Sequence, residues 1–109
     1  MYKMSDYKAD IEIAIFHKLL DLKFSIKSYG FDFWKMAIYY YNDFPNMVDL
    51  YKYIGLRYGK SWKSVEIAMR RAIDNNTKKM LQEYYNIDNY SNIVIWRLIS
   101  TEFYSVKEV

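Results

Sequence analysis

Apolar residues recur three and four positions apart along most of this chain, which is the spacing of helices that bury one side. Near the start, the residues on the side expected to be buried are Ile11, Ala14, Ile15, Lys18 and Leu22, and Leu19 widens this apolar stripe. The 109 residues include only three glycines and one proline, which leaves little material for the turns of a β-protein. The sequence therefore predicts an all-α fold, with all 109 residues in a single domain.

Helix-start and helix-end signals predict a compact domain of five or six helices. We expect these helices at about residues 7–22, 32–42, 45–58, 62–74, 78–85 and 92–103, with breaks at residues 75–77 and 86–91. Ser5 or Asp6 would cap the first helix, and Ser61 would cap the fourth. Pro45 suits the first turn of the third helix. Gly59 stands where a helix commonly ends in the left-handed conformation. The expected core positions include Trp34 and Tyr41 on the second helix, Val48 on the third and Ile93 on the last.

The excess positive charge lies in one short window of the sequence. The chain has a net charge of +3, whereas residues 1–50 and residues 72–109 each have a net charge of −1. Residues 51–71 have a net charge of +5, because Glu66 alone opposes six basic residues: Lys52, Arg57, Lys60, Lys63, Arg70 and Arg71. Such a window is typical of a surface that binds a polyanion, and equally of a solvated helix face.

The segment at about residues 46–74 fits a helix-turn-helix, in which two helices are joined by a turn of three or four residues. The turn would lie at residues 59–61, and Gly55 would let the helices approach closely. Val65 and Ala68 would form the inner side of the second helix. In this motif the second helix enters the DNA major groove, and its first residues reach base edges.

Nine residues of this segment are candidates for contact with double-stranded DNA: Arg57, Lys60, Ser61, Lys63, Ser64, Glu66, Ile67, Arg70 and Arg71. We assign phosphate contacts to Arg57, Lys60, Lys63 and Arg71. Arg70 is the main candidate for base reading, because its planar fork matches the O6/N7 pair of guanine. Lys63, Ser64 and Glu66 would assist it. If this segment binds DNA, with or without strict sequence specificity, we expect the protein to be a transcriptional regulator.

These residues also carry a family resemblance. Residues 11–75 resemble the C-terminal DNA-binding effector domain of the sporulation-initiation response regulator (stage zero sporulation protein A family). The matching positions are Leu50, Tyr51, Ile54, Gly55, Tyr58, Val65, Glu66, Ala68, Met69, Arg70, Ala72 and Ile73, with Gly30, Phe31, Lys35, Ala37, Ile38, Tyr41, Asn42 and Asp43 upstream. The resemblance implies six helices, the fourth of which reads a promoter element, and binding as pairs on DNA. A homodimer on DNA is therefore a further expectation.

The resemblance has departures that bear on specificity. Glu66 and Arg70 match family positions that face DNA, and Arg71 stands where the family has a histidine. Ser64 and Ile67 stand where the family has base-reading arginines, so we expect this chain not to read the family's DNA box. Three alternatives are left open: the chain reads another sequence, binds DNA with loose specificity, or no longer binds DNA. Ile67 is expected to be exposed between Ser64 and Arg70 or Arg71. If the helix enters the groove, Ile67 would instead pack on a thymine methyl group, favouring a site richer in A·T pairs. We also expect the chain to act without the family's receiver domain.

Enzyme chemistry has little support in the sequence. There is no cysteine, and His17 is the only histidine, which excludes thiolate and multi-histidine metal sites. No spacing identifies a nucleophile with its base. We therefore expect no catalytic residues, no metal and no cofactor.

A second hypothesis is a protein partner. The chain has 13 tyrosines, and the runs at residues 39–41 and 84–85 predict a tyrosine-rich binding surface. A small protein of a phage or mobile element could bind and inhibit a host nucleic-acid enzyme, such as a CRISPR effector, through the helix-turn-helix surface. Enrichment in Lys, Asn, Ile and Tyr indicates AT-rich codons, as in a low-GC bacterium or its phages. No targeting segment or membrane-length apolar run is present, which predicts a cytoplasmic protein.

Overall fold

The protein is all-α. The structure, a computed structural model, describes the backbone of residues 4–104 and the side chains of residues 9–104. Within that part it has six α-helices and one 3₁₀ turn, and no strand: α1 (Met4–Asp21), α2 (Tyr29–Tyr39), η1 (Tyr41–Asp43), α3 (Met47–Tyr58), α4 (Trp62–Arg71), α5 (Asn75–Tyr85) and α6 (Asn92–Phe103). No helix in the described range is long and apolar enough to cross a membrane.

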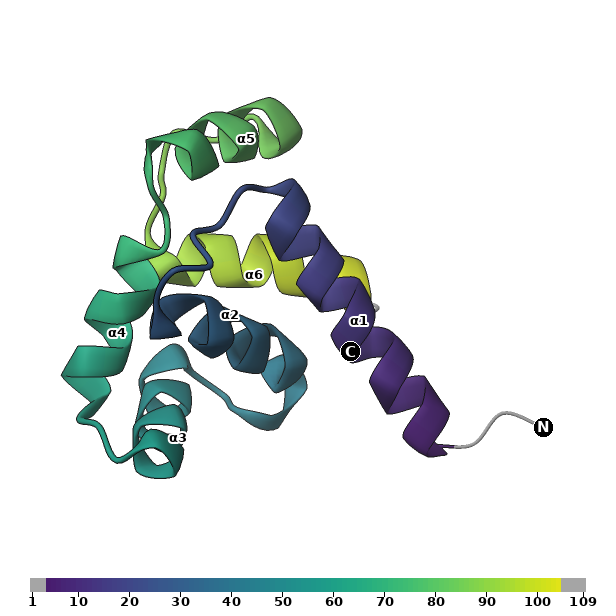
Figure 1. The fold of residues 1–109 in the computed structure, drawn as a ribbon, viewed down its shortest axis with the longest axis vertical. Coiled ribbons are helices and arrows are strands. Elements are labelled where there is room, and N and C mark those ends of the chain that lie inside the picture. The colour runs from purple at the N-terminus through teal and green to yellow at the C-terminus, as the bar shows by residue number, and fades with distance from the viewer. Residues whose placement is uncertain (1–3, 105–109) are drawn as a thin grey trace.

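Helix α2 forms the centre of the fold. Figure 1 shows α1 and α4 on opposite sides of α2, with α3 and α6 along its remaining sides. The core between these helices contains large side chains with no exposed surface, among them Phe33, Trp34, Ile54 and Met69. Trp96 of α6 donates a hydrogen bond of 2.7 Å from its indole nitrogen to the Ala37 carbonyl, which attaches α6 to α2. The buried indole nitrogen thus has the partner that burial of a polar group requires.

The joint between α3 and α4 confirms two predictions. Gly59 ends α3 with a left-handed φ of 66°. This conformation is unfavourable for a residue that has a side chain, and glycine adopts it without that cost. Ser61 caps α4, and its hydroxyl oxygen accepts the Ser64 backbone N–H at 3.2 Å. Lys60 lies in the turn, and its N–H donates to the Gly55 carbonyl at 2.8 Å. Two consecutive helices therefore meet through a turn of three residues.

The starts of the first three helices differ from the predictions. The first helix begins at Met4, so Ser5 and Asp6 lie inside it rather than before it. The second begins at Tyr29 rather than residue 32 and ends at Tyr39, before η1. Pro45 precedes α3, because the Asn46 side chain accepts the Asp49 N–H at 2.9 Å and starts the helix there. The start of α3 is therefore set by the side-chain cap of Asn46, although a proline such as Pro45 is also favourable in the first turn of a helix.

The end of α4 was also predicted wrongly. The helix stops at Arg71 rather than residue 74, because Asp74 caps the following helix instead. The Asp74 carboxylate accepts the Thr77 N–H at 3.0 Å, while the Thr77 hydroxyl accepts the Asp74 N–H at 3.3 Å. The segment at residues 75–77, predicted as a break, is therefore the first turn of α5. The bounds of α6 agree with the prediction.

Most predicted core positions are buried, with exceptions on several helices. Ala14, Val48 and Ile93 were expected inside and are exposed, and Tyr41 is only half-buried. In α6, Ile95 is buried with no exposed surface, whereas Ile93 is not. An apolar periodicity defines a helix side only to within about one residue, so neighbours on that side can exchange roles.

Candidate nucleic-acid interface

Five of the predicted DNA-contacting residues share one side of α4. We call this side the α4 outer face; it consists of Lys63, Ser64, Ile67, Arg70 and Arg71. Four of these residues are exposed, while Val65 and Met69 on the opposite side have no exposed surface. Residues three and four apart are neighbours on a helix surface, so Ile67 lies among the other four. It is half-buried, not exposed as predicted, which agrees with cover from its long neighbours.

Hydrogen bonds from two other helices hold the inner side of α4 in place. Trp34 of α2 donates a 2.8 Å hydrogen bond from its indole nitrogen to the Met69 carbonyl. Asn92 of α6 donates to the Glu66 carbonyl at 3.1 Å and to the Tyr51 hydroxyl at 3.1 Å. These bonds attach α4 to the core at two successive turns, so that the outer face is presented on a rigid support.

Close backbone packing adds to this support. A Cβ atom on Gly30, within α2, would lie 2.2 Å from the Ala68 carbonyl oxygen, so only glycine allows α2 to approach α4 this closely. The loop before α2 also reaches α4, where the Ser25 N–H donates to the Ala72 carbonyl at 3.0 Å. The carbonyl at the end of α4 is thereby satisfied without water.

The first turn of α4 combines serine hydroxyls with positive charge. The hydroxyl oxygens of Ser61 and Ser64 lie 3.0 Å apart, and both residues are exposed. The Lys63 ammonium lies 4.9 Å from the centre of the Trp62 ring and 3.6 Å from a Glu66 carboxylate oxygen. This turn has no acidic residue, so its free N–H groups and the helix dipole favour an anion.

Glu66 and Lys60 lie beside the outer face rather than on it. Glu66 is half-buried, and its carboxylate pairs with Lys63. Lys60 extends from the turn toward α2, with its ammonium 5.0 Å from the centre of the Tyr29 ring. Both therefore border the outer face, Glu66 as an acid that partly neutralises Lys63.

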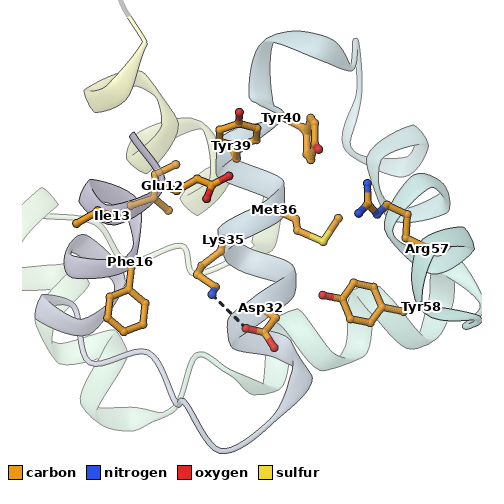
Figure 2. Close-up of a pocket in the computed structure, with 11 residues that line it drawn as sticks. Glu12, Ile13, Phe16, Asp32, Lys35, Met36, Tyr39, Tyr40, Arg57 and Tyr58 are labelled. Carbon is orange, nitrogen blue, oxygen red and sulfur yellow. Dashed lines mark ion pairs between the residues drawn. The ribbon is translucent and has the colours of Figure 1, made fainter. Parts of the chain in front are cut away.

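Arg57 lies in a different part of the molecule. It lines a groove along α2, which we call the α2 groove, whose lining residues include Phe16, Met36, Tyr39, Tyr40, Arg57 and Tyr58. Figure 2 shows Arg57 and Tyr58 on one side of α2 and Phe16 of α1 on the other. None of the described residues that line this groove belongs to α4. The structure thus separates Arg57 from the cations of the α4 outer face.

Within the groove, Arg57 is held by a tyrosine. Its guanidinium donates a 3.0 Å hydrogen bond to the Tyr53 hydroxyl and lies 5.8 Å from the centre of that ring. The same hydrogen bond lowers the pKa of the Tyr53 phenol from its ordinary value, because a neighbouring cation favours the phenolate. Tyr53 also packs against Tyr40, with 5.3 Å between the ring centres. Arg57 is therefore part of an aromatic cluster between α2 and α3.

The predicted tyrosine-rich surface is divided by the fold. Tyr39 and Tyr40 line the α2 groove, whereas Tyr41 packs on Trp96, with 4.9 Å between the ring centres. Tyr84 and Tyr85 lie on α5, and the Lys18 ammonium sits 3.7 Å from the centre of the Tyr84 ring. The two runs thus contribute to separate regions.

Sequence reasoning missed the residues that support α4. Trp34 was predicted as a core residue. Its hydrogen bond to Met69 leaves no local pattern in the sequence, because the two residues are 35 positions apart. Asn92 stands at the start of a helix, where a polar residue is typical of a cap. Only the fold shows that it is buried and bound to α4.

Neither a metal site nor a known relative adds to this geometry. Among the described residues, no group of three or more His, Cys, Asp or Glu side chains could hold a metal ion. No protein-family model, no curated protein and no solved structure matches the chain. The family resemblance therefore stays a prediction from the sequence.

Proposed function

We propose that this protein binds double-stranded DNA, with α3 and α4 acting as a helix-turn-helix and α4 entering the major groove. The observation that carries the proposal is the α4 outer face, on which Lys63, Arg70 and Arg71 surround Ile67. Neither arginine forms an ion pair within the described part of the chain, so both guanidinium groups are available to phosphates or bases.

The contacts divide by position along α4. The N-terminal end of α4 is suited to contact phosphates and base edges. It carries the Lys63 ammonium, the hydroxyls of Ser61 and Ser64 and the free backbone N–H groups. Arg70 is the base-reading residue, and Arg71 contacts a phosphate. Ile67 lies between them and meets a thymine methyl group. In this proposal Arg57 has no DNA contact, because it occupies the α2 groove.

The biological role that follows is transcriptional regulation in the cytoplasm, by a binding protein rather than an enzyme. The resemblance to the sporulation-regulator effector domain is part of the same proposal. It rests on the sequence positions given above and on the all-α fold with six helices, which is the fold the resemblance implies.

A salt titration tests the proposal. Fluorescence anisotropy of a labelled mixed-sequence duplex is measured at about 50 mM and about 200 mM salt, for the wild type and Arg71→Ala. We expect binding that weakens steeply with salt, and a slope that is lower by about one in the variant. The matched control is Arg97→Ala on α6, an exposed arginine outside the α4 outer face, which should leave the slope unchanged.

Two results of this titration would contradict the proposal. No binding at the lower salt concentration contradicts DNA binding and favours the second hypothesis, a protein partner bound through the α4 surface. Equal effects of Arg71→Ala and Arg97→Ala indicate nonspecific attraction by net charge, and contradict the role of α4.

A further inference from the structure

Helix α1 has a second apolar stripe besides the one that packs on the core. Ile15, Leu19 and Leu22 are buried inside the fold. The second stripe, which we call the α1 outer stripe, consists of Ala9, Ile13, Phe16 and Leu20. Its members are spaced by four, three and four residues, which places them along one line of the helix, as in a coiled-coil seam. Ile13 is 55% exposed and Phe16 is 39% exposed.

The stripe borders the α2 groove, because Ile13 and Phe16 also line that groove, while Leu20 packs partly against the core. In Figure 1, α1 lies on the side of α2 away from α4, and its N-terminal half extends past the end of α2. A projecting half-helix has little tertiary packing of its own, and short helices without packing are marginal in water. The stripe is thus a surface that a partner helix would stabilise.

We infer that the partner is a second copy of this chain, and that two α1 helices pair antiparallel through their outer stripes. A two-fold axis between Ala14 and Ile15 sets Ile13 against the second copy's Phe16. The same axis sets the small Ala9 against the larger Leu20. The stripe is therefore self-complementary, as an interface between identical subunits must be.

Charges at the two borders of the stripe favour the antiparallel arrangement. Asp10 and His17 are exposed along one border, so pairing sets the Asp10 carboxylate near the second copy's His17 imidazole, which can donate a hydrogen bond. Glu12 and Lys35 lie along the other border, where the Lys35 ammonium is 5.6 Å from the centre of the Phe16 ring. Pairing sets Glu12 near the second copy's Lys35. Antiparallel helices also oppose their dipoles.

The consequence for function rests on the proposed DNA binding. Because α1 and α4 lie on opposite sides of α2, pairing through α1 does not cover α4 and leaves both α4 outer faces free. Such a dimer would join two separate DNA segments rather than read adjacent half-sites. The dimer itself does not depend on DNA, so it can be tested without it.

Sedimentation velocity of the full chain without DNA, over the micromolar concentration range, tests the inference. We expect a reversible monomer–dimer equilibrium for the wild type. Ile13→Glu should raise the dimer dissociation constant by about tenfold or more, because it places a carboxylate in the apolar seam. Leu56→Glu is the matched control: Leu56 is 85% exposed on α3, outside the stripe, and its change should leave the constant unaltered.

A charge exchange provides the second measurement. Asp10→Lys should weaken the dimer, and adding His17→Asp should restore it, because the acidic and the basic position on that border are then exchanged. Circular dichroism confirms that each variant is helical, and Ala9→Arg replaces Ile13→Glu if the latter fails to fold. A wild type that stays monomeric, a dimer that survives the stripe variants, or equal loss in Leu56→Glu overturns the inference. DNA binding by a monomeric protein would overturn it while leaving the proposed function intact.

Discussion

The indole nitrogen of Trp34 and the carbonyl oxygen of Met69 are joined by a buried hydrogen bond of 2.8 Å, which fastens the central helix α2 to α4. Both side chains have no exposed surface. Because a buried donor without a partner is costly, this bond defines the distance between the two helices as well as stabilising them. The α4 outer face therefore depends on a tryptophan on another helix.

Replacing Trp34 with phenylalanine should destabilise the protein by about 1–3 kcal/mol, through loss of the hydrogen bond and of buried volume. Urea unfolding followed by circular dichroism measures the change. Trp62→Phe is the control, since Trp62 is half-buried and its indole has no hydrogen-bond partner in the described part of the chain. Equal losses in both variants would contradict a special role for the bond.

Gly30→Ala should cost more stability than Gly59→Ala. At Gly30 the added carbon would lie 2.2 Å from the Ala68 carbonyl oxygen, so α2 and α4 must separate, at a cost of about 1–3 kcal/mol. At Gly59 nothing lies within 4 Å of the added carbon, and the cost of about 1 kcal/mol comes from the positive φ alone. Thermal unfolding of both variants compares them, and the reverse order would refute this packing argument.

Stability should fall at alkaline pH because of Tyr85. Burial, with a hydrogen bond to Glu102, raises the pKa of the Tyr85 phenol above its ordinary value. The folded state then keeps a proton that the unfolded chain releases above about pH 10, so the free energy of unfolding decreases as pH rises from there. Tyr85→Phe should flatten this alkaline decline, measured by urea unfolding from pH 9 upward, about one unit below the ordinary tyrosine pKa. Tyr84→Phe, at an exposed neighbour, should leave the decline in place.

Arg57→Ala should leave DNA affinity and its salt dependence unchanged. Arg57 lies in the α2 groove and donates to the Tyr53 hydroxyl, so it does not share the α4 outer face with Arg71. Anisotropy titrations at two salt concentrations, run beside Arg71→Ala, check this. A drop in salt slope as large as that of Arg71→Ala would show that DNA extends across α3 into the groove.

Base reading is testable at the centre of the α4 outer face. Ile67→Arg should shift the preferred site toward a guanine, because arginine can bind the O6/N7 pair that isoleucine cannot. Arg70→Ala should relax preference at one base pair, with a smaller effect on random DNA. Selection from a pool of random duplexes measures both changes. Identical selected sites for the wild type and both variants would mean that α4 does not read bases.

Local features of the sequence were sufficient for the helices and for much of α4. Gly59 and Ser61 mark the α3–α4 joint through their own conformational and capping preferences, and the structure confirms both. The grouping of Lys63, Ile67, Arg70 and Arg71 on one side follows from their spacing alone, because a helix repeats every 3.6 residues. These properties need no contact with the rest of the chain.

Tertiary structure decided which cations belong together and what supports them. Arg57 precedes α4 by only a few residues, yet it lines the α2 groove and donates a hydrogen bond to Tyr53. The supports of α4 come from distant positions: Trp34 bonds to a residue 35 positions away and Asn92 to one 26 positions away. Spacing along one helix says which residues share a side, whereas the partner of that side depends on packing between helices, which a local pattern does not encode.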